Sequence, residues 1–439
     1  MADGWQDEEA AWPSEEAEEP AAFDAAWGEE QGPDEAEVPI DEEAVPISDA
    51  APAEPPPPAL RMLVWSWNTE SVRFGESVHA TRTETTLDWE SGFPVPLLSC
   101  EAPRFCESIA ARVAAEQPDL VVVGVQEDAK PGSYWLGSAL PPLLRGYRLL
   151  EKTRLIGLGL TTLTKATARG LRLAVFVRRA YAHADAIHCT TQELLCSGLA
   201  AWTRGKGGAA IVLDVPRIGR LAIVNCHLPF DSGSLGSWRA RRDALQVQAD
   251  HLEQLHAGLV LGAGQPLPDH VVLLGDLNFR IDAFQSNEPS SIGPQGLVDR
   301  ILAELAERGA AAVYAERDEL LQVLRASHWL KGYREGERDG GPHFAPTCKL
   351  RKERPPPLAH GALTLDWLKQ TLQVQASEGR RGPRTPGWAD RILFRSYAEG
   401  RHGVLAADTG ALQCMAYERW DLSPLSDHAA VMALLELQP

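Results

Sequence analysis

From Arg61 onward, short apolar runs alternate with segments in which apolar residues recur every three or four positions. Short apolar runs are typical of buried strands, and the longer spacing is typical of helices. The predicted strands cover 62–67, 120–125, 171–177, 270–274, 391–394 and 429–435, with a hairpin of 209–215 and 220–226 around 216–219. The predicted helices cover 103–116 and 238–256, with two more between 297 and 325. This alternation predicts an α/β or α+β sandwich.

Residues 1–60 differ from the rest of the chain. They hold 19 of the 61 Asp and Glu, no Lys or Arg, a proline run at 55–58 and few aliphatic residues. Such a segment buries too little apolar surface to offset the entropy lost on ordering, so we predict a disordered acidic tail with a Pro-rich linker, followed by one domain over 61–439. Aromatic residues stand among the acids, namely Trp5, Trp12, Phe23 and Trp27. The tail is therefore either a solvated spacer or a set of docking peptides for a protein partner.

The formal net charge of -19 over 439 residues belongs to this tail, because the remaining 42 acids balance all 42 Lys and Arg. A neutral domain argues against a strongly basic, non-specific nucleic-acid binder and leaves an anionic substrate open. The 7 cysteines lack CxxC pairs, which favours a reducing compartment over a disulfide framework or a zinc site. Without a signal-peptide pattern or a long apolar run, we expect a cytoplasmic protein whose membrane contacts are peripheral.

Polar residues stand where several predicted strands end. They are Asn68, Gln126 and Glu127, His227, Asp276 and Asn278, and Asp427 and His428. Strand ends on a rigid scaffold can gather such side chains at one edge of a sheet. A single His or Asp at a strand end is more often structural, but so many coincidences predict a common site.

The residue types at these positions suggest metal-assisted hydrolysis. Carboxylate and amide oxygens are ligands that Mg2+ prefers, which makes Glu127 the first candidate, supported by Asn68 and Asp427. Hydrolysis of a phosphate monoester also needs a base near a water molecule and donors for the developing charge. The residues of suitable type are Asp276, Asn278, His227 and His428. Spacing alone does not divide these tasks among them.

Three segments resemble the signature stretches of the inositol polyphosphate 5-phosphatases: GDLNFR at 275–280, PGWADRILF at 386–394 and SDHAAV at 426–431. Further matching stretches follow in the family's order, namely SWN at 66–68, VGVQE at 123–127, KGG at 206–208, CHL at 226–228 and FAPTCK at 344–349. The resemblance covers nearly all of 61–439. It implies the four-layer fold of deoxyribonuclease I and its relatives, in which two mixed β-sheets are flanked by helices.

The resemblance also implies how the reaction is divided among the residues. The residue matching Glu127 ligates Mg2+ with help from the one matching Asn68. The residue matching Asp276 activates or orients the attacking water, and the one matching Asn278 positions that water and contacts the phosphoryl group.

The imidazoles have implied roles as well. The residue matching His428 binds the scissile phosphate and is held by the one matching Asp390, and a carboxylate beside an imidazole favours its cationic form. The residue matching His227 is a further phosphate donor. Water then attacks in line while charge on the phosphoryl oxygens is stabilised.

Substrate selectivity is expected to depend on cationic side chains. In the family, the stretch matching FAPTCK lies beside the 4-phosphate of the inositol ring, which points to Lys349, with Lys206 and Arg280 as further substrate-binding candidates. Arg391 is either a substrate ligand or a structural ion-pair partner.

Two basic clusters suggest membrane contact. They comprise Lys349, Arg351, Lys352 and Arg354, and then Arg380, Arg381 and Arg384. They are either solvated loops or a surface that docks on an anionic leaflet, where each cation contributes about 1 kcal/mol.

The chain departs from the family pattern at five positions. Cys348 stands where Tyr or Phe is usual, Gly205 where Asn is, Asp231 where a second His is, Ala389 where Cys is frequent and Phe279 where Tyr is. None removes a group from the implied chemical step. They remove an aromatic hydroxyl, an amide and an imidazole from substrate-facing loops, which bears on the preference among inositol phosphates.

The predicted function is a Mg2+-dependent phosphatase that removes the 5-phosphate of phosphoinositides or soluble inositol polyphosphates, with no nucleic-acid partner. Two alternatives remain open: a nuclease or apurinic endonuclease of the same superfamily, and a catalytically silent module that binds phosphoinositides.

Overall fold

The computed structural model describes fifteen stretches within one compact unit, Pro56–Pro439. They are residues 59–69, 82–87, 94–98, 104–129, 140–156, 169–196, 206–229, 238–260, 266–284, 292–337, 340–351, 363–374, 383–397, 412–420 and 426–438. The predicted disorder and docking role of the acidic tail fall almost entirely outside these residues. In the described part of the chain, no helix is long and apolar enough to cross a membrane.

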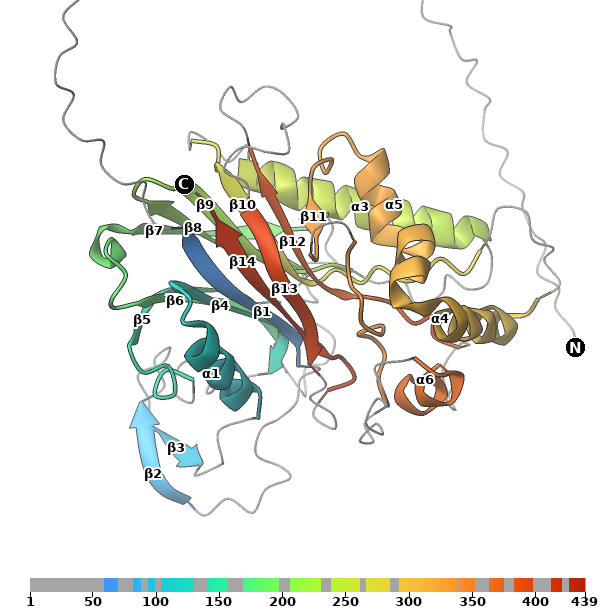
Figure 1. Cartoon of the computed structure of the whole chain (residues 1–439), viewed down its shortest axis with the longest axis horizontal. Coiled ribbons are helices and arrows are strands. Elements are labelled where there is room, and N and C mark those ends of the chain that lie inside the picture. The colour runs from blue at the N-terminus through green and yellow to red at the C-terminus, as the bar shows by residue number, and fades with distance from the viewer. Residues whose placement is uncertain are drawn as a thin grey trace, which may run out of the picture. The chain divides into compact units, whose positions relative to one another are not determined.

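Two six-stranded sheets form the centre of the fold (Figure 1). The first has the strand order β13 (Leu412–Trp420), β14 (Ala430–Leu437), β1 (Leu60–Asn68), β4 (Leu120–Ala129), β6 (Arg169–Arg178) and β5 (Tyr147–Ile156). The second has the order β11 (Arg334–Glu335), β12 (Asp390–Ser396), β10 (His270–Asp276), β9 (Gly219–His227), β8 (Gly207–Val215) and β7 (His188–Leu195). A separate pair joins β2 (Arg82–Leu87) to β3 (Pro94–Leu98).

Both large sheets are mixed. Strand β1 runs antiparallel to β14 and parallel to β4, and β10 runs antiparallel to β12 and parallel to β9. The parallel pairing aligns Asn68 with Gln126 and Asp276 with His227. Polar residues at the ends of these strands therefore lie at matching heights in each sheet.

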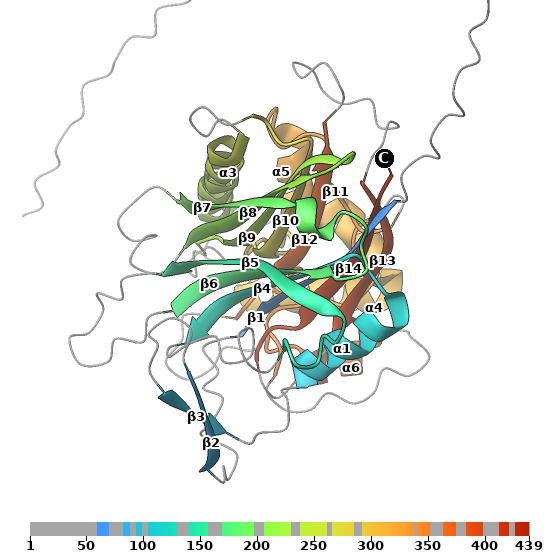
Figure 2. The ribbon, with the colours of Figure 1, turned by 90° about the vertical axis from the view of Figure 1, so that its left-hand side faces the viewer.

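Helices cover the outer faces of the two sheets (Figure 2). Helix α1 (Arg104–Glu116) packs on the first sheet and α3 (Trp238–Val260) on the second. Helices α4 (Pro294–Arg317), α5 (Glu319–Ala326) and α6 (Leu365–Thr371) follow in the chain. A short 3-10 turn, η2 (Ala184–Ala186), lies between β6 and β7. The order helix, sheet, sheet, helix is the four-layer sandwich expected from the sequence, and that prediction is confirmed.

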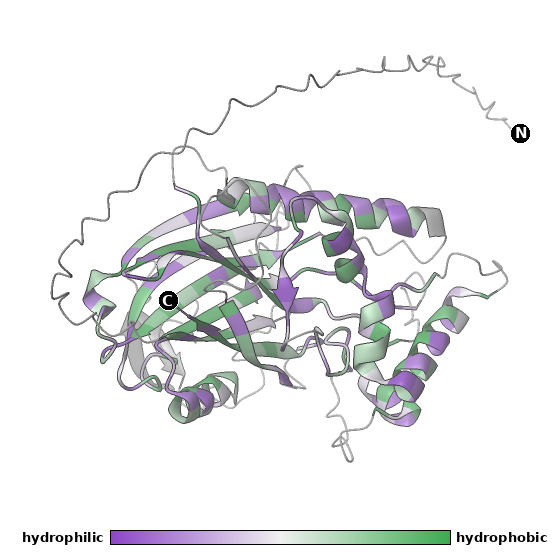
Figure 3. Ribbon diagram, turned by 45° about the horizontal axis from the view of Figure 1, so that its top comes forward, coloured by the Kyte–Doolittle hydropathy of each residue, from purple (hydrophilic) through white to green (hydrophobic). Residues whose placement is uncertain are grey.

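Strand β1 explains why its sequence reads as a continuous apolar run. Met62 and Val64 face the core between the two sheets, whereas Leu63, Trp65 and Trp67 face α1. A strand with helices on one side and a second sheet on the other is buried on both faces, so it carries no polar alternation. Figure 3 shows hydrophilic and hydrophobic colour mixed along α3, the long helix at the top of the view.

The sequence predicted the interior strands of the two large sheets and missed their four edge strands β13, β5, β11 and β7, as well as the separate pair β2 and β3. Strand β7 reads HCTTQELL and is largely exposed, and β5 carries charged residues along its length. An edge strand needs no continuous apolar run because one side of it is not paired. The predicted hairpin is formed by β8 and β9, and the two helices expected after 297 are α4, which begins at Pro294, and α5.

Candidate active site

The second sheet places three candidate residues side by side at one end. Asp276 is the last residue of β10, and its register partners are His227 at the end of β9 and Asp390 at the start of β12. Asn68 ends β1 in the first sheet, and His428 lies two residues before β14. The ends of strands from both sheets therefore meet at one edge of the sandwich.

Asp276 is the centre of this cluster. Its Oδ2 accepts a hydrogen bond from Asn68 Nδ2 at 2.8 Å and lies 3.4 Å from His227 Nε2 and 4.0 Å from His428 Nε2. Its Oδ1 accepts the backbone N–H of Asn278 at 3.0 Å. Burial alone would raise the pKa of Asp276, but the charges of His428 and Lys206 hold it well below the usual range. The carboxylate is therefore ionised and fixed in orientation.

His428 carries the opposite charge. Its Nδ1 lies 2.9 Å from Asp390 Oδ2, and both side chains are buried. Burial alone would lower the pKa of His428, but the charges of Asp390 and Asp276 outweigh it and raise the pKa well above the usual value. The imidazole is therefore a cation at neutral pH, with its Nε2 turned toward Asp276 and 3.3 Å from Cys348 Sγ.

His227 behaves in the opposite way. Its Nε2 contacts Lys206 Nζ, and burial together with the Lys206 charge lowers the pKa of His227 below its usual value. In the neutral imidazole this nitrogen accepts from the ammonium group of Lys206. The positive charge at this position is thus carried by Lys206 and not by His227. The role of His227 as a phosphate donor stays a prediction.

Glu127 reaches the site through an irregularity in β4. The pairing of β4 with β6 shifts register between Val125 and Asp128, and Glu127 has a φ of 55°. Bulges re-aim side chains, and a left-handed backbone at a non-glycine residue is uncommon. The Glu127 side chain is 17% exposed, and its Oε1 lies 3.8 Å from His227 Nε2. Asn278, with a φ of 60°, is a second left-handed residue here, and such residues cluster at functional sites.

The donor set at this edge fits a hard cation. Glu127 and Asp276 bring carboxylates to within 3.8 Å and 3.4 Å of the same His227 nitrogen, and Asn68 adds an amide. Oxygen donors of this kind suit Mg2+. Among the residues that the structure describes, no three His, Cys, Asp or Glu side chains already form a ready metal-binding group.

Asp427, the third predicted ligand, lies in a different environment. Its Oδ2 accepts from Lys349 Nζ at 2.5 Å and lies 3.9 Å from an Arg384 nitrogen, while its Oδ1 is 3.6 Å from His428 Nε2. A carboxylate that faces these cations is a weaker candidate for a metal ligand than Glu127.

The substrate-binding candidates separate into two groups. Lys206 and Lys349 reach the cluster as described, and Arg280, which is buried, donates to Asn278 Oδ1 at 3.2 Å. Arg391 is 0% exposed and forms ion pairs with Asp318 and Glu335. A fully buried guanidinium with two carboxylate partners cannot contact a substrate. The prediction that Arg391 binds substrate is therefore wrong, and Arg391 is the structural ion-pair partner that the sequence offered as the alternative.

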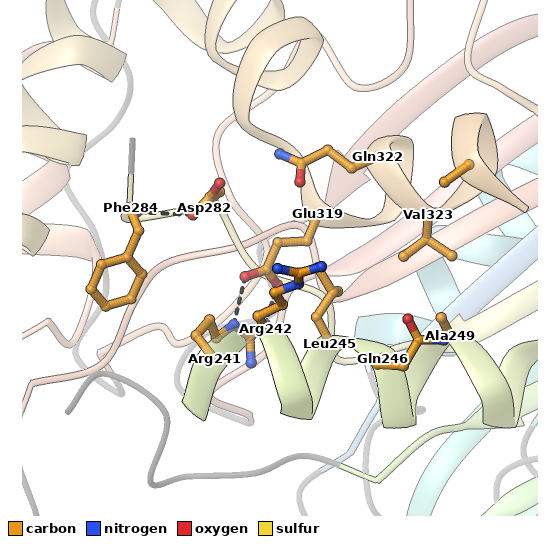
Figure 4. Close-up of a pocket in the computed structure, with 11 residues that line it drawn as sticks. Arg241, Arg242, Leu245, Gln246, Ala249, Asp282, Phe284, Glu319, Gln322 and Val323 are labelled. Atoms are coloured by element: carbon orange, nitrogen blue, oxygen red, sulfur yellow. Dashed lines mark hydrogen bonds and ion pairs between the residues drawn. The ribbon is translucent and has the colours of Figure 1, made fainter. Parts of the chain in front are cut away.

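The loop after β10 is held by residues that the sequence did not reveal. The Arg280 backbone N–H donates to Glu319 Oε2 at 2.8 Å, and Arg241 Nε donates to Glu319 Oε1 at 2.6 Å. Figure 4 shows this ion pair at a hollow of about 330 Å³ between α3 and α5, next to Asp282 and Phe284. Arg241 and Glu319 lie in no recognisable motif, because their connection arises only when the two helices meet.

The departures from the family pattern are partly described. Cys348, Phe279 and Ala389 are all fully buried. Gly205 and Asp231 lie outside the described residues, as do Lys352, Arg354, Arg380 and Arg381 of the basic clusters. The described cations Lys349 and Arg384 lie near Asp427, so the predicted membrane-docking surface stays a prediction.

Comparison with known proteins identifies the family. Residues 65–434 match the endonuclease/exonuclease/phosphatase family 2. The type IV inositol polyphosphate 5-phosphatase 3 of Arabidopsis thaliana is 22% identical over 268 residues, which make up 60% of this chain and 32% of that protein. The chain thus spans about a third of the length of this relative.

Solved structures give weaker matches. A Cimex nitrophorin, as its ferrous NO complex, is 16% identical, with a TM-score of 0.48 over 88% of this chain and 100% of the other. An endonuclease/exonuclease/phosphatase of Beutenbergia cavernae is 17% identical, with a TM-score of 0.36 over 87% and 72%. From the match over residues 65–434, the chain belongs to the endonuclease/exonuclease/phosphatase family 2, as a hydrolase of the phosphatase or nuclease type.

Proposed function

We propose that the protein is a Mg2+-dependent phosphatase that removes the 5-phosphate from phosphoinositides or soluble inositol polyphosphates. The observation that carries the proposal is the surroundings of Asp276. An ionised carboxylate is held by Asn68 and Asn278 beside a buried imidazolium, His428, whose charge is stabilised by Asp390. A base and a cation thus face the same small volume.

The chain's own residues divide the reaction as follows. Asp276 orients the attacking water because both of its oxygens are held by hydrogen bonds, and its low pKa keeps it ionised, in the form that can accept a proton from that water. His428 donates from Nε2 to a phosphoryl oxygen, and the Lys206 ammonium adds a second positive charge close by. Fixed cations of this kind stabilise the charge that develops on the phosphoryl oxygens, and they need no reorganisation during the reaction.

Glu127, assisted by Asn68, would hold the magnesium ion. When bound, the ion supplies Lewis-acid stabilisation of phosphoryl charge. The partial exposure of Glu127, in contrast to the burial of Asp276 and Asp390, is consistent with a ligand that faces the substrate side.

Inositol phosphates are the favoured substrate class for two reasons: the sequence stretches that resemble the inositol polyphosphate 5-phosphatases, and the similarity to the Arabidopsis protein. The matched relative is named as an inositol polyphosphate 5-phosphatase. Lys349, in the FAPTCK stretch, lies beside Asp427 and so next to His428. A cation at this point suits a second phosphate on the substrate, in addition to the one being hydrolysed.

Two other functions are less well supported. A nuclease would be expected to extend basic surface along a nucleic-acid backbone, whereas residues 61–439 carry equal numbers of acids and bases. A silent binding module has no need for a fixed carboxylate beside an imidazolium. A cytoplasmic location, peripheral contact with anionic membranes and a protein partner for the acidic tail also remain parts of the proposal.

Phosphate release by the purified full chain tests the proposal. The assay covers phosphoinositides in vesicles, soluble inositol phosphates with and without a 5-phosphate, and duplex DNA containing an abasic site, each with Mg2+ or with a chelator. We expect Mg2+-dependent release that requires a 5-phosphate. Cleavage of the DNA at a comparable rate would favour the nuclease, and binding of inositol phosphates without release would favour the silent module.

A further inference from the structure

A buried hydrogen-bond network connects the two sheets directly behind Glu127. Gln126 in β4 donates from Nε2 to Asn225 Oδ1 in β9 at 2.6 Å. Asn225 in turn donates from Nδ2 to the carbonyl oxygens of Val125 at 2.9 Å and Arg172 at 2.8 Å. Both amide side chains are 0% exposed. One asparagine of the second sheet thus bonds to two neighbouring strands of the first.

The network lies in otherwise largely apolar surroundings. The space between the sheets is filled mainly by an apolar cluster, in which a polar group is costly unless it is fully hydrogen-bonded. A Cβ at Gly124 would lie 2.9 Å from Asn225 Cγ and 2.6 Å from Leu274 Cδ1. The glycine therefore makes room for the close approach of Asn225 to β4.

The other neighbour of Glu127 is also held. Asp128 forms a buried ion pair with Arg172, the same residue whose carbonyl accepts from Asn225. Glu127 thus stands between Gln126 and Asp128, each tied to the sheets by its side chain. Its left-handed backbone and the register shift fall between these two attachments. A strained conformation persists only where its surroundings enforce it.

We infer that Asn225 is a positioning residue for Glu127. Through its hydrogen bond with Gln126 and through the bulge in β4, Asn225 fixes the Glu127 carboxylate where that carboxylate can hold a divalent cation. The inference rests on the proposed function, in which Glu127 ligates that cation. Neither Asn225 nor Gln126 touches the reacting groups. Their effect is to preorganise a ligand, and outer partners of metal ligands typically contribute a factor of 10 to 100 in metal affinity.

Binding of Mn2+ to the full chain, measured by the loss of the free-ion electron paramagnetic resonance signal, tests this role without any substrate. We expect Asn225→Ala to weaken Mn2+ binding about 10- to 100-fold. The Mg2+ concentration needed for half-maximal phosphate release should rise by the same factor, with activity recovered at saturating Mg2+. A merely structural role would lower activity at every Mg2+ concentration.

Ser396→Ala is the matched control. Ser396 pairs with His270 at the far end of β10 from Asp276, and its hydroxyl also accepts the backbone N–H of Leu412 in the first sheet. Its loss therefore also removes buried hydrogen bonds, one of which joins the two sheets. It should lower the thermal midpoint and leave Mn2+ binding unchanged. If Asn225→Ala does not fold, Gly124→Ala, which crowds Asn225 without deleting a polar group, should weaken Mn2+ binding in the same direction.

Glu127→Gln separates failure of the inference from failure of the proposed function. If Glu127→Gln loses Mn2+ and folded Asn225→Ala or Gly124→Ala binds it like the wild type, the positioning role is overturned and the proposed function stands. If the wild type itself binds no Mn2+, or Glu127→Gln binds it as tightly as the wild type does, both are overturned.

Discussion

His428 Nδ1 and Asp390 Oδ2 lie 2.9 Å apart, and both side chains are buried. Because the carboxylate raises the pKa of the imidazole, His428 keeps its proton at neutral pH, and in the proposed reaction this imidazolium donates a hydrogen bond to a phosphoryl oxygen. Asp390 does not reach the substrate side itself in this account. It determines the charge of the residue that does.

Replacing Asp390 with Asn should therefore change the pH dependence of the reaction. Without the carboxylate, burial lowers the pKa of His428, so the active imidazolium is lost as pH rises through a lower value than in the wild type. We expect activity to fall about 100-fold at pH 8 and much less at pH 6. The pH–rate profile, together with a nuclear magnetic resonance titration of His428, measures this shift. A uniform loss at all pH values would contradict the assigned role.

Arg391→Met should reduce stability rather than substrate affinity. The substitution leaves Asp318 and Glu335 buried without their guanidinium partner, and breaking a buried pair in this way costs about 3–5 kcal/mol. Urea unfolding monitored by tryptophan fluorescence measures the loss, and the KM of the folded fraction should not change. A raised KM with unchanged stability would return Arg391 to the substrate site.

The buried imidazole of His256 should make stability depend on pH. It contacts Tyr333 and Tyr397, and burial followed by the Arg395 charge lowers the pKa of His256 from 6.5 to about 4. The folded protein favours neutral His256, so this contribution is complete above pH 6.5 and is lost as pH falls toward 4. The maximum contribution of His256 to the free energy of unfolding is about 3 kcal/mol.

The matched pair His256→Gln and His188→Gln checks this prediction. His188 is exposed and begins β7. Urea midpoints at pH 7.5 and 5 should differ less in His256→Gln than in the wild type, whereas His188→Gln should retain the wild-type difference. Equal pH sensitivity of all three proteins would rule out His256 as the source.

The sequence predicted those features that a single strand determines by itself, namely its burial and the polar residues at its end. Interior strands are buried on both faces and carry continuous apolar runs, so β1, β4 and β10 were found, whereas the edge strands β5 and β7 carry a weaker pattern. The polar strand ends identified most of the site for the same reason, since Asn68, Asp276 and His227 interrupt such runs.

The features that the sequence did not predict depend on contacts between segments that are distant along the chain. Arg391 stands inside a recognised motif, and only its burial against Asp318 and Glu335 identifies it as structural. Asn225 reads as one more strand residue until Gln126, far away in sequence, is found beside it. Hydrophobic patterns do not encode such pairings, because they depend on how the two sheets meet.

The proposed function depends most on Asp276 as the base of a metal-dependent phosphate hydrolysis. Phosphate release from a soluble inositol polyphosphate with a 5-phosphate, measured for wild type and Asp276→Asn at saturating Mg2+, tests it directly. We predict Mg2+-dependent release by the wild type and a loss of about 10²- to 10⁴-fold in the variant, with an unchanged fold. Release by Asp276→Asn at the wild-type rate would contradict the claim.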